Sequence, residues 1–143
     1  MTEYRKVIMI QVELSKIIID EKRQDQIIVL KEKSGERQFP IVIGFLEASS
    51  IKMKLSGVEV PRPMTHDLLV SVIGGLDAKL EQLLIDKLIA NTFHAKLVLK
   101  TGSGETKQVD ARPSDGIALA VRAGAPIFVE DEVMQKAAIF KIE

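Results

Sequence analysis

The sequence predicts an α+β domain whose sheet is mixed but largely antiparallel, is built from hairpins and has about four helices packed on it. Two observations predict this class. Segments rich in valine and isoleucine are separated by hairpin-type turns, of which the clearest lie at residues 33–36 and 101–104. Apolar residues at helical spacing fill the segments between the hairpins. This alternation disfavours a purely parallel, doubly wound sheet.

The first part of the chain is predicted to form three strands. Residues 7–19 and 27–30 are rich in β-branched side chains, and a charged turn at 20–26 separates them. After the turn at 33–36, residues 38–43 would form the returning strand. The three segments therefore predict strands that are joined by turns.

Two helices are predicted next. The first lies between Gly44 and Gly57, and its apolar positions at helical spacing are Ala48, Ile51 and Leu55. Residues 58–64 include two prolines and should form a stiff loop. The second helix would begin at Thr65 and end at the glycines 74–75. Its apolar stripe, expected to face the core, consists of Leu68, Leu69, Val72, Ile73 and Leu76.

The next segments predict a second group of strands. Residues 79–85 and 92–100 are strand-like, with a turn near Asn91 between them. Residues 105–110 would pair back after the turn at 101–104. This part therefore adds further hairpins to the sheet.

The chain is predicted to end with a helix, a strand and a helix. The third helix would start near Ser114 and end at Gly124, burying Ile117, Ala120 and Val121. Pro126–Val129 would be a short strand. Asp131 would then cap a final helix that runs to about Phe140.

The length and composition limit the classes of function. The 143 residues form one predicted domain, 1–143, and 46% of them are apolar, as in a folded globular protein. Lysine and arginine together number 20, as do aspartate and glutamate, so net charge gives no general attraction to nucleic acid or membranes. No apolar run approaches the ~20 residues that span a bilayer. Cysteine is absent, which fits a reducing compartment, and we expect a cytoplasmic protein without a membrane partner.

Two short stretches of the sequence repeat one pattern. Residues 62–67 and 112–115 each place an arginine, a proline, a hydroxyl residue and an aspartate before an apolar helical pattern. Helix N-termini attract anions through unpaired N–H groups, and arginine fits phosphate or carboxylate. If the fold brings the two stretches together, they would form a polar pocket for a phosphorylated ligand.

Several blocks, in order, resemble one known family. They read FPIVIG at 39–44, EA at 47–48, PRPMTHDLL at 61–69, NTFHA at 91–95, VDARPSDGIALA at 109–120 and APIFV at 125–129. In this set and order they resemble the bifunctional nuclease domain family. The resemblance implies nuclease activity on RNA and DNA. We therefore expect a metal-assisted nuclease that acts on single-stranded or flexible nucleic acid. At position 116 this chain has glycine where the family pattern usually has alanine.

Phosphodiester hydrolysis requires an activated water and a way to stabilise the charged transition state. We hypothesise that His66 is a proton shuttle and that Asp67 and Asp115 hold a divalent metal, Mg or Mn. The candidate catalytic residues are His66, Asp67, Ser114 and Asp115. The candidate phosphate-binding residues are Arg62, Thr65 and Arg112.

Each of these residues also has a structural interpretation. Thr65 and Ser114 have the side chains of N-caps, and Asp67 and Asp115 would complement a helix dipole in the first turn. Arg112 would pair equally well with a nearby aspartate. The alternative function is therefore a non-catalytic binding or regulatory module with an anion pocket. It would be a homo-oligomer, and residues 137–140 would form either a subunit contact or helix packing within the domain. Hydrolysis of small phosphoesters by the same pocket is a third alternative.

Overall fold

The computed structural model describes residues 7–20, 22 and 24–138, and within them it has seven strands and four helices. The elements are β1 (Met9–Ile18), β2 (Asp25–Glu32), β3 (Gln38–Gly44), α1 (Phe45–Leu55), α2 (Thr65–Gly75), β4 (Ala78–Ile89), β5 (Thr92–Thr101), β6 (Thr106–Ala111), α3 (Pro113–Ala123), β7 (Ile127–Glu130) and α4 (Asp131–Ala137). The predicted α+β class is confirmed. None of the helices in these residues is long and apolar enough to cross a membrane.

All seven strands belong to one sheet in the order β3-β2-β1-β7-β4-β5-β6. The sheet contains two antiparallel three-stranded units, β1-β2-β3 and β4-β5-β6. β7 joins them, because it pairs antiparallel with β1 and parallel with β4. The sheet is therefore mixed and largely antiparallel, as predicted.

The turn between β4 and β5 shows how the sequence fixes a hairpin. Ala90 and Asn91 both have positive φ, at 50° and 64°. Two such residues in a two-residue loop give the twist that joins antiparallel strands, and asparagine tolerates that conformation well. The predicted turn near Asn91 is confirmed, although β4 continues to Ile89 instead of ending at residue 85.

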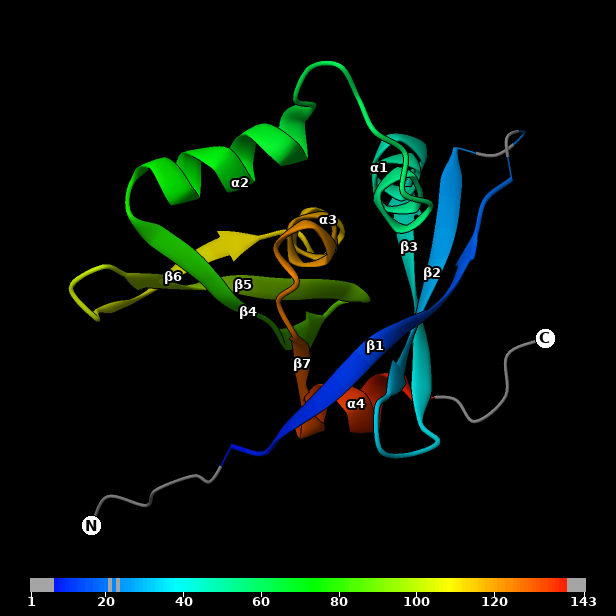
Figure 1. Ribbon diagram of the computed structural model, residues 1–143. Coiled ribbons are helices and arrows are strands. Elements are labelled where there is room, and N and C mark those ends of the chain that lie inside the picture. Colours follow the sequence, from blue (N-terminus) through cyan, green and yellow to red (C-terminus); the bar gives the residue numbers. More distant parts are fainter. Residues whose placement is uncertain (1–6, 21, 23, 139–143) are drawn as a thin grey trace, which may run out of the picture.

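The helices gather at the two ends of β7. α3 lies against β4 and β5 and is flanked by α1 and α2, whereas α4 lies at the other end of β7 and contacts β3, β4 and β7 (Figure 1). Most of α3 is buried, and its Ile117 contributes to the same core as Leu83 and Ile85 of β4. A Cβ atom at Gly116 would come within 2.4 Å of Leu83 Cδ1. Glycine at this position therefore lets the first turns of α3 approach the sheet closely.

The predicted burial of the α2 stripe is wrong for most of its members. Leu68 is 54% exposed and Leu76 is 76% exposed, and Leu69 and Val72 are also exposed. Val70, which lies off the predicted stripe, packs against the core instead. α2 is apolar on more than one face, so periodicity alone did not identify the buried face.

The predicted caps of three helices are also wrong. The N-cap residue of α2 is Met64, so Thr65 is the first residue of that helix. The N-cap residue of α3 is Arg112, so Ser114 is the second residue of that helix, after Pro113. Pro113 explains the earlier start of α3, because its fixed φ and missing N–H suit the first helical position. Glu130, not Asp131, is the N-cap of α4. The predicted end of this helix at about residue 140 lies outside the described residues.

Candidate functional site

The first turns of α2 and α3 meet. His66 of α2 and Asp115 of α3 are 3.0 Å apart between Nε2 and Oδ1. The two Arg-Pro stretches are therefore joined through the residues that follow their prolines. α3 also lies against α1, so side chains from three helices gather at this point. We call this group the helix network; it consists of Glu47, Ser50, His66, Asp67, Arg112, Asp115 and Arg122.

His66 lies at the centre of the helix network and is buried. Its Nδ1 atom is 2.8 Å from the hydroxyl oxygen of Ser50, and its Nε2 atom faces Asp115. With a neutral ring, Nε2–H donates to the Asp115 carboxylate and Nδ1 accepts from the Ser50 hydroxyl. Both ring nitrogens therefore have partners inside the protein. The geometry suits a residue that positions Asp115.

Asp115 connects His66 to the exposed Arg112. The Nε and Nη2 atoms of Arg112 lie 3.0 and 2.9 Å from Asp115 Oδ2, and Nη2 also lies 3.2 Å from Glu47 Oε1. Burial alone would raise the pKa of Asp115, but the hydrogen bonds from His66 and Arg112 outweigh it and lower that pKa. The Arg112 side chain is nevertheless 68% exposed. It is held by carboxylates and open to a ligand.

Asp67 forms the second branch of the helix network. Its Oδ2 atom accepts from the backbone N–H of Met64 at 3.0 Å, and its Oδ1 atom accepts from Nε of Arg122 at 2.8 Å. These two bonds lower the pKa of Asp67. Arg122 has a side chain only 6% exposed and also donates to the Ser50 carbonyl oxygen at 3.3 Å. This branch ties α1, α2 and α3 together. The bond from the N–H of the N-cap residue Met64 also confirms the structural interpretation of Asp67 as a first-turn acid of α2.

The two predicted metal ligands do not fit a divalent cation in this arrangement. Each of the four carboxylate oxygens of Asp67 and Asp115 accepts from an arginine, a histidine or a backbone N–H. A metal ion needs free oxygen lone pairs, and an adjacent guanidinium repels it. In the part of the chain that the structure describes, no three acidic or histidine side chains gather as a possible metal site.

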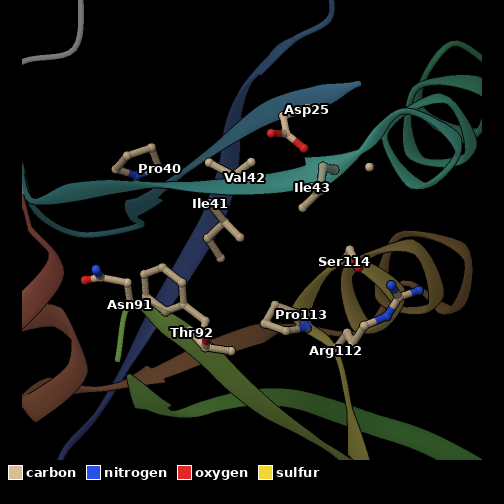
Figure 2. Close-up of a pocket in the computed structure, with 12 residues that line it drawn as sticks. Asp25, Pro40, Ile41, Val42, Ile43, Asn91, Thr92, Arg112, Pro113 and Ser114 are labelled. Atoms are coloured by element: carbon tan, nitrogen blue, oxygen red, sulfur yellow. The ribbon is translucent and has the colours of Figure 1, made fainter. Parts of the chain in front are cut away.

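A pocket of about 480 Å³ lies beside the start of α3. Figure 2 shows it between β3, the start of β5 and the first turn of α3, with Arg112 at one end and Asn91 at the other. We call it the α3-start pocket; the residues that line it are Asp25, Pro40, Ile41, Val42, Ile43, Gly44, Asn91, Thr92, Phe93, Arg112, Pro113 and Ser114. Arg112 belongs to both the pocket and the helix network.

The sequence-predicted site residues divide into three groups. Arg112 and Ser114 line the α3-start pocket, whereas His66, Asp67 and Asp115 belong to the helix network behind it. Arg62 and Thr65 are exposed before and at the start of α2 and do not line this pocket. The three predicted phosphate-binding residues are therefore not in one pocket.

Sequence reasoning missed three residues of this region. Arg122 lies two helical turns after Asp115 on the same helix, a spacing that indicated a shared face. Ser50 had no such signal, because a serine inside a helical pattern usually faces solvent. Asp25 joins the pocket wall because it pairs in register with Gly44, and a strand register cannot be read from one strand alone.

Comparison with known proteins gives one family and a few relatives. The sequence profile of the family described as the bifunctional nuclease domain matches residues 28–141. Uncharacterized proteins MT1877 and Rv1829, from two strains of Mycobacterium tuberculosis, are each 38% identical to this chain over 123 residues. The match covers 86% of this chain and 73% of each relative.

A more distant relative carries a functional name. The protein called Bifunctional nuclease 2, from Oryza sativa subsp. japonica, is 27% identical over 122 residues. That match covers 84% of this chain but 38% of the rice protein.

Proposed function

This chain belongs to the bifunctional nuclease domain family, and on that basis we propose that it is a nuclease that hydrolyses phosphodiester bonds of RNA, DNA or both at the α3-start pocket. One observation carries the choice of site. The pocket brings together a guanidinium, a hydroxyl group and the N-terminus of an eleven-residue helix, from Arg112, Ser114 and α3. All three are donors, and together they suit a phosphate group.

The proposed reaction places negative charge where these donors lie. A water molecule attacks phosphorus and the bond from phosphorus to one sugar oxygen breaks. Arg112 and Ser114 stabilise the charge that develops on the other phosphate oxygens. Asp25 is the only acid among the residues described as lining the pocket. We therefore assign it the role of general base, which accepts the proton of the attacking water. The leaving sugar oxygen takes a proton from solvent.

The helix network has a supporting role in this proposal. Glu47 and Asp115 hold the guanidinium of Arg112, and His66 holds Asp115. Fixing an arginine in advance lowers the cost of ordering it on the substrate. His66 and Asp115 are thus positioning residues rather than groups that contact the phosphate.

Arg62 and Thr65 remain candidates for a second phosphate. They flank the start of α2, which His66 joins to the start of α3. A single strand that lies across both helix starts would place one phosphate in the pocket and a neighbouring one near Arg62. In this case Arg62→Gln would weaken binding of oligonucleotides and leave binding of a dinucleotide unchanged.

The hydrolysis assay uses purified protein and single-stranded RNA and DNA oligonucleotides. Arg112→Gln should lower kcat/KM by about 100-fold, because one charged donor to the transition state is lost. Asp25→Asn should lower kcat by ~10²–10⁴-fold. Lys107→Gln is the matched control, because Lys107 is exposed on β6 and outside the pocket.

The same assay tests the metal expectation and guards against contamination. It is run with Mg²⁺, with Mn²⁺ and with EDTA, each for the wild type and both pocket variants. Activity that Arg112→Gln and Asp25→Asn leave intact would come from a contaminating nuclease and would contradict the proposal. If the activity requires a metal ion, its ligands would be groups other than the carboxylates of Asp67 and Asp115, whose oxygens are already paired within the protein.

A second candidate function is a non-catalytic oligomeric binding module. The exposed apolar residues of α2 favour it, because Leu68, Val72 and Leu76 recur every four residues, which places them on one side of the helix, where a second copy of the chain could cover them. In a thermal-shift screen, stabilisation by small phosphorylated compounds without any hydrolysis of oligonucleotides would support this candidate. Like the cytoplasmic location expected from the sequence, it remains a proposal.

A further inference from the structure

The α3-start pocket has two chemically different ends. Arg112, Pro113 and Ser114 form one end, and Pro40 and Asn91 lie at the other (Figure 2). The first end carries donors suited to an anion. Flat or apolar side chains surround the second end, together with one carboxamide. The volume of about 480 Å³ is in the range of sites for a single small molecule.

The end of the pocket at Arg112, Pro113 and Ser114, which we call the anion end, contains a hydroxyl group without a hydrogen-bond partner in the described part of the protein. Ser114 is 6% exposed, lines the pocket and has no hydrogen-bond partner for its hydroxyl within the described residues. Because this hydroxyl lies in the pocket wall and has no acceptor among the described protein atoms, it can donate to an oxygen of a bound ligand.

Backbone donors lie next to that hydroxyl. The first intrahelical bond of α3 runs from the N–H of Gly116 to the carbonyl oxygen of Arg112. The N–H groups of Ser114 and Asp115 precede it and have no intrahelical acceptor. Pro113 contributes no N–H at all, so the donors of this turn are concentrated at two successive residues. Together with the hydroxyl group they would bind the oxygens of one phosphate.

The other end suits a planar aromatic ligand. Phe93 stacks on Phe39 with ring centroids 5.4 Å apart and an interplanar angle of 27°, so its ring is fixed before any ligand arrives. Pro40 and Ile41 supply further apolar surface. The carboxamide of Asn91 offers one donor and one acceptor group, which are complementary to the edge of a nucleobase.

We propose that the pocket binds one nucleotide unit, with its phosphate on the first turn of α3 and its base between Pro40, Phe93 and Asn91. This inference rests on the proposed function and deepens it, because a pocket for one unit would bind the terminal nucleotide of a strand. Nucleoside monophosphates then act as competitive inhibitors of hydrolysis. Inorganic phosphate and the free nucleoside each occupy only one end.

The test is calorimetric titration of the full chain with AMP and UMP, and separately with adenosine and inorganic phosphate. We expect each monophosphate to bind at least 10-fold more tightly than either fragment. Ser114→Ala should weaken monophosphate binding by about 5- to 10-fold, because one hydrogen bond to a charged group is lost. Ser71→Ala is the matched control, because Ser71 is an exposed serine on α2.

A second variant tests the base end without disturbing the fold. Asn91→Gly keeps a residue that accepts positive φ and removes the side chain with its carboxamide. It should weaken binding of AMP by about 3- to 10-fold and leave binding of inorganic phosphate unchanged. Equal affinities for monophosphate and inorganic phosphate would overturn the inference. So would monophosphate binding that both Ser114→Ala and Asn91→Gly leave unchanged.

The two proposals fail in different ways. Monophosphate binding with the expected variant effects, but without hydrolysis of oligonucleotides, would contradict the nuclease function and support the nucleotide pocket. Hydrolysis that AMP and UMP do not inhibit would support the function and contradict the pocket.

Discussion

The Nε2 atom of His66 lies 3.0 Å from Oδ1 of Asp115, across 49 positions of sequence. This contact links the first turn of α2 to the first turn of α3. The hydroxyl oxygen of Ser50, on α1, lies 2.8 Å from the other ring nitrogen of His66, Nδ1, so α1 also contacts this side chain. One buried imidazole therefore connects three helices and orients the aspartate that holds Arg112.

Replacing His66 with alanine should mainly affect stability and substrate binding. The change leaves the Ser50 hydroxyl and one Asp115 oxygen without partners, so we expect a loss of about 2–3 kcal/mol in the free energy of unfolding. Urea denaturation measures it. In the hydrolysis assay KM should rise more than kcat falls, since Arg112 is less well fixed. If kcat instead fell by about 100-fold or more while stability stayed unchanged, His66 would be the proton shuttle predicted from sequence.

The contribution of Asp67 to stability should depend on pH. Hydrogen bonds from Met64 and Arg122 lower the pKa of Asp67 in the folded state. A lowered carboxyl pKa stabilises the fold above the unfolded-state value of ~3.9, and this stabilisation is lost as the pH falls through the folded-state value. Asp67→Asn should therefore be less stable than the wild type at pH 7 by about 2 kcal/mol, and the difference should shrink toward pH 2. A difference that stays constant from pH 7 to pH 2 would contradict this account.

The same variant distinguishes an ion-pair role of Asp67 from a metal-binding role. Because Arg122 and a backbone N–H occupy its oxygens, Asp67→Asn should change the melting temperature equally with and without Mg²⁺. Thermal denaturation in Mg²⁺, Mn²⁺ and EDTA measures this. A metal-induced rise in melting temperature that appears in the wild type and disappears in Asp67→Asn would support the metal role predicted from sequence.

Gly116→Ala should destabilise the protein although alanine is the better helix former. The added methyl would meet Leu83 Cδ1 at 2.4 Å, and Leu83 is fully buried. Overpacking costs ~1–3 kcal/mol, and the gain in helix propensity offsets at most ~1 kcal/mol of it. Chemical denaturation of Gly116→Ala, Leu83→Ala and the double variant measures the coupling. The double variant should lose at least ~1 kcal/mol less than the sum of the single variants, whereas additive losses would contradict the predicted clash.

The exposed face of α2 makes a prediction about assembly. If a second copy covers it, Leu68→Lys and Leu76→Lys should convert an oligomer to a monomer, because each would bury a charge in an apolar contact. Light scattering after size-exclusion chromatography measures the molecular mass. Val109→Lys on β6 is the control, because Val109 is also an exposed apolar residue but lies on another element. A wild-type protein that is monomeric at all concentrations would exclude this face as a self-association surface.

The sequence predicted those parts of the fold that depend on local chemistry. Hairpin turns are local, and the turn near Asn91 follows from a residue that tolerates positive φ. The start of α3 lies one residue before the predicted Ser114, because Pro113 takes the first helical position. Cap positions are therefore less predictable than the helices that they begin.

The candidate site was predictable only in part. The two Arg-Pro stretches pointed to Arg112 and Ser114, which line the pocket, and to Asp115 behind it. The role of Asp67 depends on Arg122 of α3, and the role of His66 depends on Ser50 of α1. Partners distant in sequence decide whether a carboxylate is free or paired, and no local pattern reports them.

The position of β7 has a consequence for how the chain folds during synthesis. β7 is the last strand described, yet it lies between β1 and β4 in the middle of the sheet. Until residues 127–130 leave the ribosome, no strand connects the two three-stranded units by hydrogen bonds. The sides of β1 and β4 that later pair with β7 remain unpaired. Such edges invite pairing with other chains. Nascent chains that stall before residue 127 should thus be especially prone to aggregate, and insertion of this one short strand would close the sheet.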